Sequence, residues 1–288
     1  MDPKNIHFLT PYNFGSLPEE KSSYENSKAV ILPVPYDGTA TYRPGARFGP
    51  RAIITASKYL DFYDDELKKN FSDIGICTLD ELEVSFNPEE TAESVYESVK
   101  RLAEDKKFPI VFGGEHSITF GAVKALKEKF PDLGVLHLDA HADVRANEKL
   151  DHSNVARKIL ELCPVSFAGI RSISVDEAEF IEENKIKIFS AREIMEKRDF
   201  GRIISHLPEN IYITIDLDVL DPSIMPSVGT PQPGGIGWYE LIDLLKSAAK
   251  EKNIVGFDIV ELCPSENISP DFLSAKLAYK MIGYKFYK

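Results

Sequence analysis

Short runs rich in β-branched and other apolar residues recur along this chain, separated in most cases by amphipathic segments. Both faces of the runs are apolar, which is typical of parallel strands covered by helices on two sides. The alternation of the two element types therefore predicts an α/β fold with a mainly parallel sheet of about eight strands. The predicted strands lie at residues 28–34, 71–76, 108–114, 133–140, 164–170, 185–189, 210–219 and 253–262.

Helix-start signals precede most of the amphipathic segments. Proline fits the first helical turn, and a serine or threonine followed three residues later by glutamate forms a capping box. These signals predict where the helices of the α/β fold begin. They are Pro50, Pro88, the pairs Ser174–Glu177 and Ser190–Glu193, and Ser269 as an N-cap before Pro270.

Composition and charge restrict the class of protein. No internal repeat and no Gly/Ser-rich or Pro-rich linker divides the chain, so we expect one domain over residues 1–288. No stretch approaches the roughly 18 consecutive apolar residues of a membrane span. The net charge of −12 repels nucleic-acid phosphates and anionic lipids and favours cationic substrates and metal ions. We therefore expect neither nucleic acid nor membrane as a partner.

The cysteines and the N-terminus indicate the compartment. Cys77, Cys163 and Cys263 form an odd, widely spaced set without a CxxC motif. The first ten residues lack the charged and then apolar profile of a signal peptide. Both observations predict a cytoplasmic protein.

Polar residues collect where four of the predicted strands end. Ligands of open parallel sheets bind at the carboxyl ends of the strands, so these positions are candidate site residues. Asp139, His141 and Asp143 are spaced i, i+2 and i+4, which in an extended chain places their side chains on one face. Asp216 and Asp218 repeat the i, i+2 spacing. His116 and Glu261 follow two further strands.

This crowding of carboxylates predicts a metal centre. Without a cation the charges would repel and raise several pKa values. Carboxylate and imidazole ligands without thiolate suit Mn²⁺ and similar divalent ions, and six candidate ligands exceed what one ion needs. We therefore predict two bridged ions, a pair that generally activates water for hydrolysis at neutral pH. The candidate ligands are His116, Asp139, His141, Asp143, Asp216 and Asp218.

Some of these residues have plainer explanations. Asp139 to His141 can be a helix cap with a surface histidine, and Asp218 can belong to an ordinary turn, although both clusters together disfavour this. Within its apolar run, His137 is interpreted as a core histidine or as one that supports a ligand. His152 either reaches over the metals from a loop or only starts a helix beside Asp151.

Glu261 has two interpretations, and two further histidines are interpreted as surface residues. Glu261 is either a carboxylate for a cationic group or a surface acid at a strand end. His7 and His206 lie away from strand ends and are interpreted as surface residues.

Five motifs give the chain a specific resemblance. They are GTATYRPGARFGP (38–50), GGEHS (113–117), LDAHADVR (138–145), TIDLDVLDP (214–222) and DIVELCP (258–264). Together they resemble the ureohydrolase family of arginases and agmatinases, over nearly the whole chain. The resemblance implies a single catalytic domain with a three-layer α-β-α fold, two Mn²⁺ ions, and hydrolysis of a guanidino group to urea and an amine. It also implies a homo-oligomer, a trimer or hexamer.

The resemblance assigns roles to the candidate residues. It implies one ion bound by His116, Asp139, Asp143 and Asp216, and another by Asp139, His141, Asp216 and Asp218. Glu261 resembles the glutamate that pairs with the guanidinium, and Asp218 the carboxylate that passes a proton to the leaving amine. His152 resembles the family's loop histidine, a proton shuttle near the substrate. The motif around it reads Asp-His-Ser instead of the more usual Ser-His-Gly or Ser-His-Ala.

The same comparison predicts the substrate. Arg145 stands where arginases typically carry asparagine, and residues 169–174 read GIRSIS instead of the aspartate-rich GLRDVD. We therefore predict an agmatinase that forms putrescine and urea, with Arg145 holding its loop through Glu148 or Asp151. The alternatives are arginase and hydrolases of N1-aminopropylagmatine or guanidinobutyrate. A metallophosphoesterase would need a GNHE-like stretch that is absent, and a non-catalytic metal protein is disfavoured by the complete ligand set.

Overall fold

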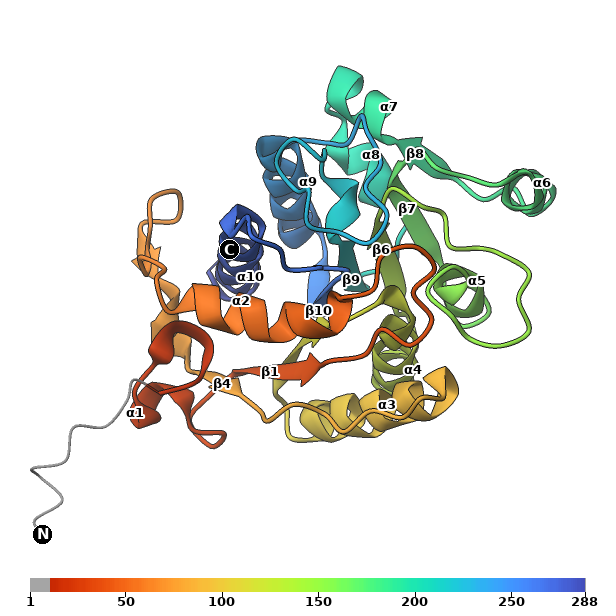
Figure 1. Ribbon diagram of the computed structural model, residues 1–288. Coiled ribbons are helices and arrows are strands. Elements are labelled where there is room, and N and C mark those ends of the chain that lie inside the picture. The colour runs from red at the N-terminus through yellow and green to blue at the C-terminus, as the bar shows by residue number, and fades with distance from the viewer. Residues whose placement is uncertain (1–10, 288) are drawn as a thin grey trace, which may run out of the picture.

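The centre of the computed structural model, which describes residues 11–287, is an eight-stranded sheet with every strand pair parallel (Figure 1). The strand order is β4-β1-β5-β10-β9-β6-β7-β8. This arrangement confirms the predicted α/β fold. The strands are β1 Ala29–Val34, β4 Ile76–Thr78, β5 Phe108–Gly113, β6 Gly134–Leu138, β7 Val165–Ile170, β8 Ile188–Ser190, β9 Asn210–Asp216 and β10 Asn253–Val260. A separate antiparallel hairpin joins β2 Tyr63–Asp64 to β3 Lys69–Asn70.

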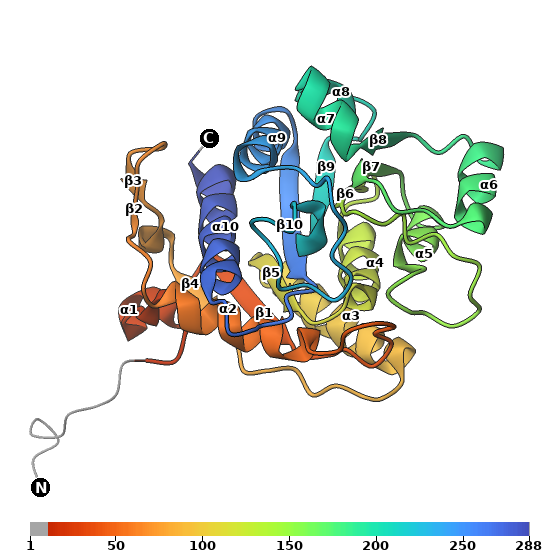
Figure 2. The same cartoon turned by 45° about the horizontal axis from the view of Figure 1, so that its top comes forward.

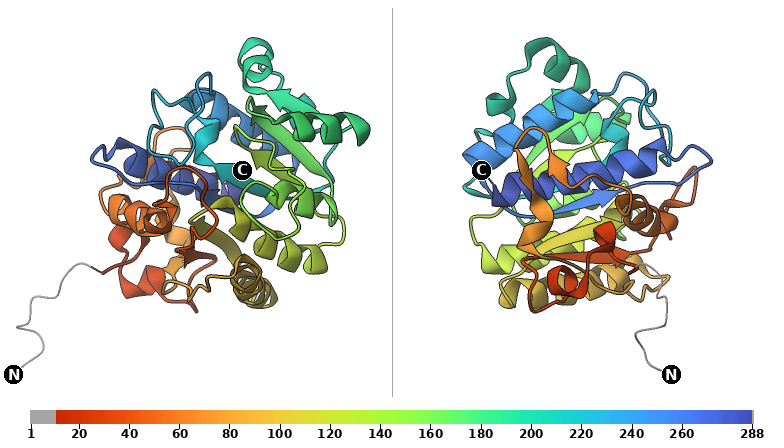
Figure 3. Two further views of the ribbon diagram at one scale, coloured as in Figure 1. Left: turned by 45° about the vertical axis from the view of Figure 1, so that its right-hand side comes forward. Right: turned by 90° about the vertical axis from the view of Figure 1, so that its left-hand side faces the viewer.

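Helices cover both faces of the sheet, as Figure 2 shows from a tilted view. One face carries α2 Gly49–Ser57, α7 Ala191–Lys197, α8 Phe200–Ile204, α9 Trp238–Glu251 and α10 Ser269–Phe286. The other carries α3 Pro88–Glu104, α4 Thr119–Lys129, α5 Val155–Leu160 and α6 Val175–Glu183. In Figure 3, α9 and α10 lie alongside each other. The short helix α1 Glu19–Ser22 lies near the start of β1, and 3-10 turns span Phe14–Ser16, Ala46–Phe48, Phe71–Ile74, His116–Ile118 and Leu217–Val219.

The strands are apolar on both faces because each face has its own hydrophobic core. In β5, Ile110 and Phe112 pack into the core under α2, α9 and α10, whereas Val111 between them packs into the core under α3 and α4. Successive side chains of a strand point to opposite faces, so a central strand covered on both sides needs a continuous apolar run.

Three predictions of strand or cap positions differ from the structure, at residues 71–76, at Ser269 and at residues 190–193. Residues 71–74 form a 3-10 turn, and the strand begins only at Ile76, after Gly75 at a φ of 76°. Ser269 is the first residue of α10 and not its cap. Its N–H donates a hydrogen bond to the Asn267 side-chain oxygen. The capping box at Ser174 and Glu177 is complete.

The box predicted at residues 190–193 is only half formed. The Ser190 hydroxyl accepts a hydrogen bond from the Glu193 N–H, but the Glu193 carboxylate bonds Lys197 and Arg202. His206 is exposed as predicted. His7 lies outside the described residues.

The strand order determines where the polar strand ends meet. β5, β10, β9 and β6 are adjacent, and all their carboxyl ends lie at one edge of the sheet. The register pairs Val260 with Asp216 and Leu138 with Ile215. The residues that follow these strands therefore start out as neighbours. None of the helices within residues 11–287 is long and apolar enough to cross a bilayer.

The close packing of α3 on α4 requires a glycine at position 121. A Cβ atom there would lie 2.1 Å from the Ala92 carbonyl oxygen, whereas at Gly201 in α8 the nearest atom would be a flexible Glu251 carboxylate oxygen at 3.5 Å. We expect Gly121→Ala to lower the free energy of unfolding by about 1–3 kcal/mol through overpacking. Gly201→Ala should be neutral or stabilise by up to about 1 kcal/mol. Urea denaturation of both variants measures this, and a Gly121→Ala protein as stable as wild type would contradict it.

Candidate metal centre and active site

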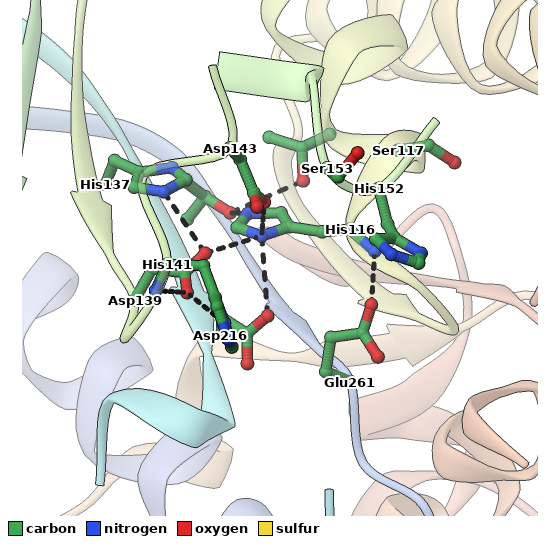
Figure 4. A network of polar contacts seen from close by, with 12 residues as sticks. His116, Ser117, His137, Asp139, His141, Asp143, His152, Ser153, Asp216 and Glu261 are labelled. Atoms are coloured by element: carbon green, nitrogen blue, oxygen red, sulfur yellow. Dashed lines mark hydrogen bonds and ion pairs between the residues drawn. The ribbon is translucent and has the colours of Figure 1, made fainter. Parts of the chain in front are cut away.

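The six predicted ligands lie together at the carboxyl edge of the sheet. Figure 4 labels all of them except Asp218. Asp139 directly follows β6 and Asp216 ends β9, while His116 and Asp218 lie in the 3-10 turns that come after β5 and β9. His141 and Asp143 belong to the loop after β6. Three chain segments thus contribute to one cluster.

The first part of the cluster surrounds the His116 ring. Its Nδ1 lies 3.0 Å from Asp139 Oδ2, 3.3 Å from Asp143 Oδ2 and 3.5 Å from Asp216 Oδ2. His137 stacks on His116, with ring centroids 4.9 Å apart, and its Nε2 lies 3.1 Å from Asp139 Oδ2. His116, His137, Asp139 and Asp143 form a buried group whose ligand atoms all lie within 4.8 Å of one another.

The second part of the cluster contains His141 and Asp218. His141 Nδ1 lies 2.9 Å from Asp218 Oδ2 and 3.5 Å from Asp139 Oδ1. Asp139, His141 and Asp218 form another group that can hold a metal ion. Because Asp139 belongs to both groups, the two positions are adjacent and share a carboxylate.

The ligands converge through turns, not through the extended chain that the spacing predicted. β6 ends at Leu138, and Asp143 has a left-handed φ of 52°. In an extended strand, residues i and i+4 would lie about 13 Å apart, too far to face one centre. The loop therefore curls so that Asp143 reaches His116 from the side opposite Asp216 (Figure 4).

Backbone N–H groups hold one oxygen of each of three carboxylates. His141 N–H donates to Asp139 Oδ1 at 2.6 Å, Ala140 N–H to Asp218 Oδ1 at 2.9 Å, and Asp218 N–H to Asp216 Oδ1 at 2.8 Å. The Oδ2 atom of each carboxylate contacts a histidine of the cluster. The turns thereby direct one oxygen of every carboxylate into the centre.

A buried network that the sequence did not reveal orients His116. Its Nε2 lies 2.7 Å from the Thr214 hydroxyl, which also lies 3.4 Å from the Thr119 hydroxyl. Thr119 and Tyr212 both donate to Asp258. Such partners of a second ring nitrogen fix the orientation of metal-binding histidines. Thr214 and Asp258 lie inside the TIDLD and DIVEL motifs, and this was the only feature of the sequence that pointed to them.

Some donor atoms of the cluster lack hydrogen-bond partners in the protein, and their types suit a divalent metal ion. His116 Nδ1 and Asp139 Oδ2 are buried and close, yet neither makes a hydrogen bond of acceptable geometry. Such orphaned atoms are rare in protein interiors unless an ion or water satisfies them. Imidazole nitrogens and carboxylate oxygens, without thiolate, are the ligand set of borderline and hard divalent cations.

The charges of the cluster shift its pKa values in opposite directions. Burial alone would lower the pKa of both histidines, but neighbouring carboxylates raise the pKa of His116 well above its usual value and that of His141 to about 12. Burial and the charges of Asp218 and Asp139 raise the pKa of Asp216. Protons therefore neutralise the metal-free cluster, and metal ions must displace them.

Glu261 lies beside the cluster in the same pocket. Its carboxylate accepts a hydrogen bond from His116 N–H at 3.0 Å, and its backbone adopts a left-handed φ of 67°. Burial, and secondarily the charge of Glu115, raises the pKa of Glu261 to about 8. Among the described residues no lysine or arginine pairs with it, so Glu261 is a carboxylate that lacks a countercation and is not a plain surface acid.

His152 lines the pocket from a loop, as one of its two interpretations predicted. Arg145 also lines the pocket, but its predicted partners are wrong. Its Nε lies 3.8 Å from the carboxylate of Glu177 in α6, and its N–H bonds the Ser153 carbonyl. Glu148 and Asp151 were chosen because they are near in sequence, whereas α6 approaches only in the folded chain.

Arg171 is a further residue that the sequence did not single out. Its Nη2 donates to the carbonyls of Asp218 and Gln232, each at 2.7 Å, and its Nε donates to Pro233. Burial lowers its pKa, while the cluster carboxylates favour its charged form. Arg171 therefore joins the ligand turn after β9 to the loop around residue 232 and places a fixed positive charge behind the cluster.

Comparison with known proteins identifies the family. The arginase family model matches residues 27–283, and the chain belongs to this family. It is 37% identical over 282 residues to the N(1)-aminopropylagmatine ureohydrolase of Synechocystis sp., covering 92% of each chain. It is 34% identical over 261 residues to the agmatinase of Pyrococcus horikoshii, covering 88% of this chain and 90% of that one.

Solved structures agree with this assignment. The crystal structure of the agmatine ureohydrolase of Thermoplasma volcanium superimposes with a TM-score of 0.86 at 31% identity, covering 98% of this chain and 96% of that chain. The predicted ureohydrolase resemblance is thus confirmed, and the chain is a ureohydrolase that acts on guanidino compounds. The family depends on a binuclear metal centre, and the histidine and aspartate cluster can bind metal.

The shared carboxylate of Asp139 predicts an uneven effect of single substitutions on metal content. Asp139 belongs to both ligand groups and Asp143 to only one, so Asp139→Asn should lose both ions and Asp143→Asn about one. Elemental analysis after dialysis against Mn²⁺ measures the stoichiometry. In wild type, Mn²⁺ should raise the melting temperature, with about 2.7 kcal/mol of stabilisation per site at 100 times Kd. Equal metal content in the two variants would contradict the shared-ligand arrangement.

The raised pKa of Glu261 predicts a pH-dependent cost in the metal-free protein. The folded pKa of about 8 exceeds the ordinary value of 4.5, so the folded state binds the extra proton and loses stability as pH rises between these values. Glu261→Gln cannot ionise and should be more stable than wild type at pH 8, by roughly 1–3 kcal/mol. Denaturation of both chelated proteins at several pH values measures the difference. The gain should vanish near pH 4.5; a gain that is constant with pH would exclude ionisation as its cause.

Proposed function

We propose that this chain hydrolyses agmatine to putrescine and urea with two Mn²⁺ ions bound at its active site. The observation that carries the proposal is the position of Glu261. Its carboxylate lacks a countercation and lies in one pocket with the two ligand groups. A guanidinium bound to Glu261 would therefore rest next to the metals.

The ligand set supports a binuclear site. His116, Asp139, Asp143 and Asp216 would hold one ion, and Asp139, His141, Asp216 and Asp218 the other. His137, which the sequence placed outside the ligand set, lies close enough to Asp139 to support the first position. When bound, such a pair supplies a nucleophile from water at neutral pH.

The protein residues would position the substrate and move its protons. A cation removes the electrostatic cost of the partly buried Glu261 carboxylate, so binding of the guanidinium is favoured and its carbon is oriented toward the metals. The Asp218 carboxylate would pass a proton to the departing amine, which cannot leave as an anion. His152 lines the pocket and is partly exposed, so it can exchange protons with solvent.

The surroundings of Arg145 support an amine without a carboxylate. An arginine substrate needs a donor for its α-carboxylate, but Arg145 is paired with Glu177. The acidic chain also favours a dication over a zwitterion. N1-aminopropylagmatine is the second candidate, because the Synechocystis relative carries that name. N1-aminopropylagmatine differs from agmatine only by an aminopropyl group on the amine, at the end of the molecule opposite the guanidinium.

A competition assay tests the substrate. With Mn²⁺-loaded protein and equal concentrations of agmatine, N1-aminopropylagmatine and arginine, we expect agmatine to be consumed at least about tenfold faster than arginine, a gap of about 1.4 kcal/mol in transition-state binding. Chromatography of the amine products measures the rates. Faster consumption of N1-aminopropylagmatine would select the second candidate, and preferential ornithine formation would overturn both.

Asp218→Asn serves as the control for this assay. The substitution is nearly isosteric but removes the proposed proton carrier and weakens one metal position. Urea release at the wild-type rate from this variant would point to a contaminating hydrolase or remove Asp218 from the mechanism. Repeating the assay with a second independent preparation of each protein separates these two explanations.

A further inference from the structure

The loop of residues 37–47 forms part of the pocket wall and is closed on itself. The buried Asp37 carboxylate accepts a hydrogen bond from Gly45 N–H at 2.8 Å and pairs with Arg47. Gly45 has a φ of 135°, a conformation that side chains rarely allow. The loop therefore has a defined shape; Thr41 lines the pocket, and Thr39 lies two residues before it.

Glu115 attaches this loop to the sheet. Its side chain is fully buried, and Glu115 lies between β5 and the 3-10 turn His116–Ile118. It accepts hydrogen bonds from Thr39 N–H at 2.7 Å, from the Thr39 hydroxyl, and from the Ser117 hydroxyl at 2.7 Å. None of the ion pairs among the described residues involves Glu115, so hydrogen bonds alone satisfy its carboxylate.

The Thr39 hydroxyl connects this attachment to His152. Its oxygen accepts the His152 N–H at 3.1 Å while its proton is donated to Glu115. The Thr41 hydroxyl lies 3.3 Å from the His152 ring Nε2. Two residues of one loop thus hold both the backbone and the ring of His152. Only a hydroxyl at position 39 can accept and donate in this way.

We propose that Thr39, held by Glu115, is a positioning residue that places His152 over the active site. The proposal rests on the proposed function, in which His152 carries protons between the pocket and solvent. His152 comes from a loop with no strand beneath it, and the hydrogen bonds inside that loop, from the N–H groups of Asp151 and Ser153, constrain its neighbours without fixing its distance from the loop of residues 37–47. Thr39 supplies that constraint from a different part of the chain.

A purely structural role for Thr39 predicts other effects. Loss of a buried hydrogen bond would lower stability and metal content together, whereas a positioning role lowers the rate of proton transfer at full metal content. Thr39 does not line the pocket itself, so substrate binding should change little. The two roles therefore differ in which quantity changes.

Thr39→Val and Thr39→Ser form a matched pair for the test. Valine keeps the shape but lacks the hydroxyl, and serine restores it. Hydrogen–deuterium exchange of the peptide containing the His152 amide, on Mn²⁺-loaded protein without substrate, should be at least about tenfold faster in Thr39→Val and close to wild type in Thr39→Ser. Unchanged exchange in Thr39→Val would overturn the proposed attachment.

Kinetics on agmatine then test the consequence. General acid–base groups contribute about 10²–10⁴ in rate, and we expect Thr39→Val to lose at least about tenfold in kcat, with KM within about twofold of wild type and metal content unchanged. Thr39→Ser should recover most of kcat. If wild type is active and Thr39→Val retains the wild-type kcat, the positioning role is overturned but the proposed function is not.

A double-mutant cycle with His152→Ala shows whether the effect passes through His152. If Thr39 acts by positioning His152, adding Thr39→Val to His152→Ala should lower kcat by less than about twofold, because residues in one network are not additive. A further tenfold loss would overturn the proposal. A wild type that releases urea from no guanidino compound would overturn the proposed function and the positioning role with it, whatever the exchange rates show.

Discussion

Electrostatic crowding at the carboxyl edge of the sheet is the constraint on which the site depends. Asp139, Asp216 and Asp218 are buried within contact of three histidines. In the metal-free protein, protons on His116 and His141 and on Asp216 and Asp218 offset much of the negative charge. Burying several carboxylates together costs stability unless cations balance them. The orphaned atoms of His116 and Asp139 show that the side chains do not satisfy one another. The cluster is therefore arranged for metal ions, and its stability and its chemistry are linked.

Fixed polar groups around the cluster keep it in this arrangement. Backbone N–H groups hold three of the carboxylates, and the Thr214 hydroxyl holds the second nitrogen of His116. Arg171 joins the turn after β9 to a neighbouring loop through carbonyl oxygens, and within residues 11–287 no carboxylate forms an ion pair with it. Preorganised dipoles and charges of this kind avoid reorganisation when a ligand binds or reacts. The pocket side is organised similarly, because Glu115 and Thr39 connect two loops that have no regular secondary structure.

The sequence predicted the positions of the strands and candidate ligands better than the contacts between residues of different segments. Apolar runs located every strand of the central sheet except β4, which the predicted stretch 71–76 meets only at Ile76, since a strand buried on both faces must be apolar throughout. It failed at residues 71–74, where Gly75 ends a turn within an apolar stretch. The six candidate ligands were identified by residue type and position at strand ends, but their extended arrangement was wrong because Asp143 requires a left-handed turn. Arg145 received the wrong partners because proximity along the chain was the only guide, and Glu177 approaches from α6.

The sequence by itself determined the fold class, the edge of the sheet where the site lies, and the ligand types, because each follows from local pattern and residue chemistry. The tertiary structure decided how these side chains reach one another, since that depends on the order in which β5, β10, β9 and β6 lie side by side. It also decided the roles of Arg171, Thr214 and Thr39, whose chemistry as single residues is ordinary. The partners Asp218, His116 and His152 lie 47 to 113 residues away in the chain, and no local pattern records such distances. Contacts between distant segments exist only once the strands have paired.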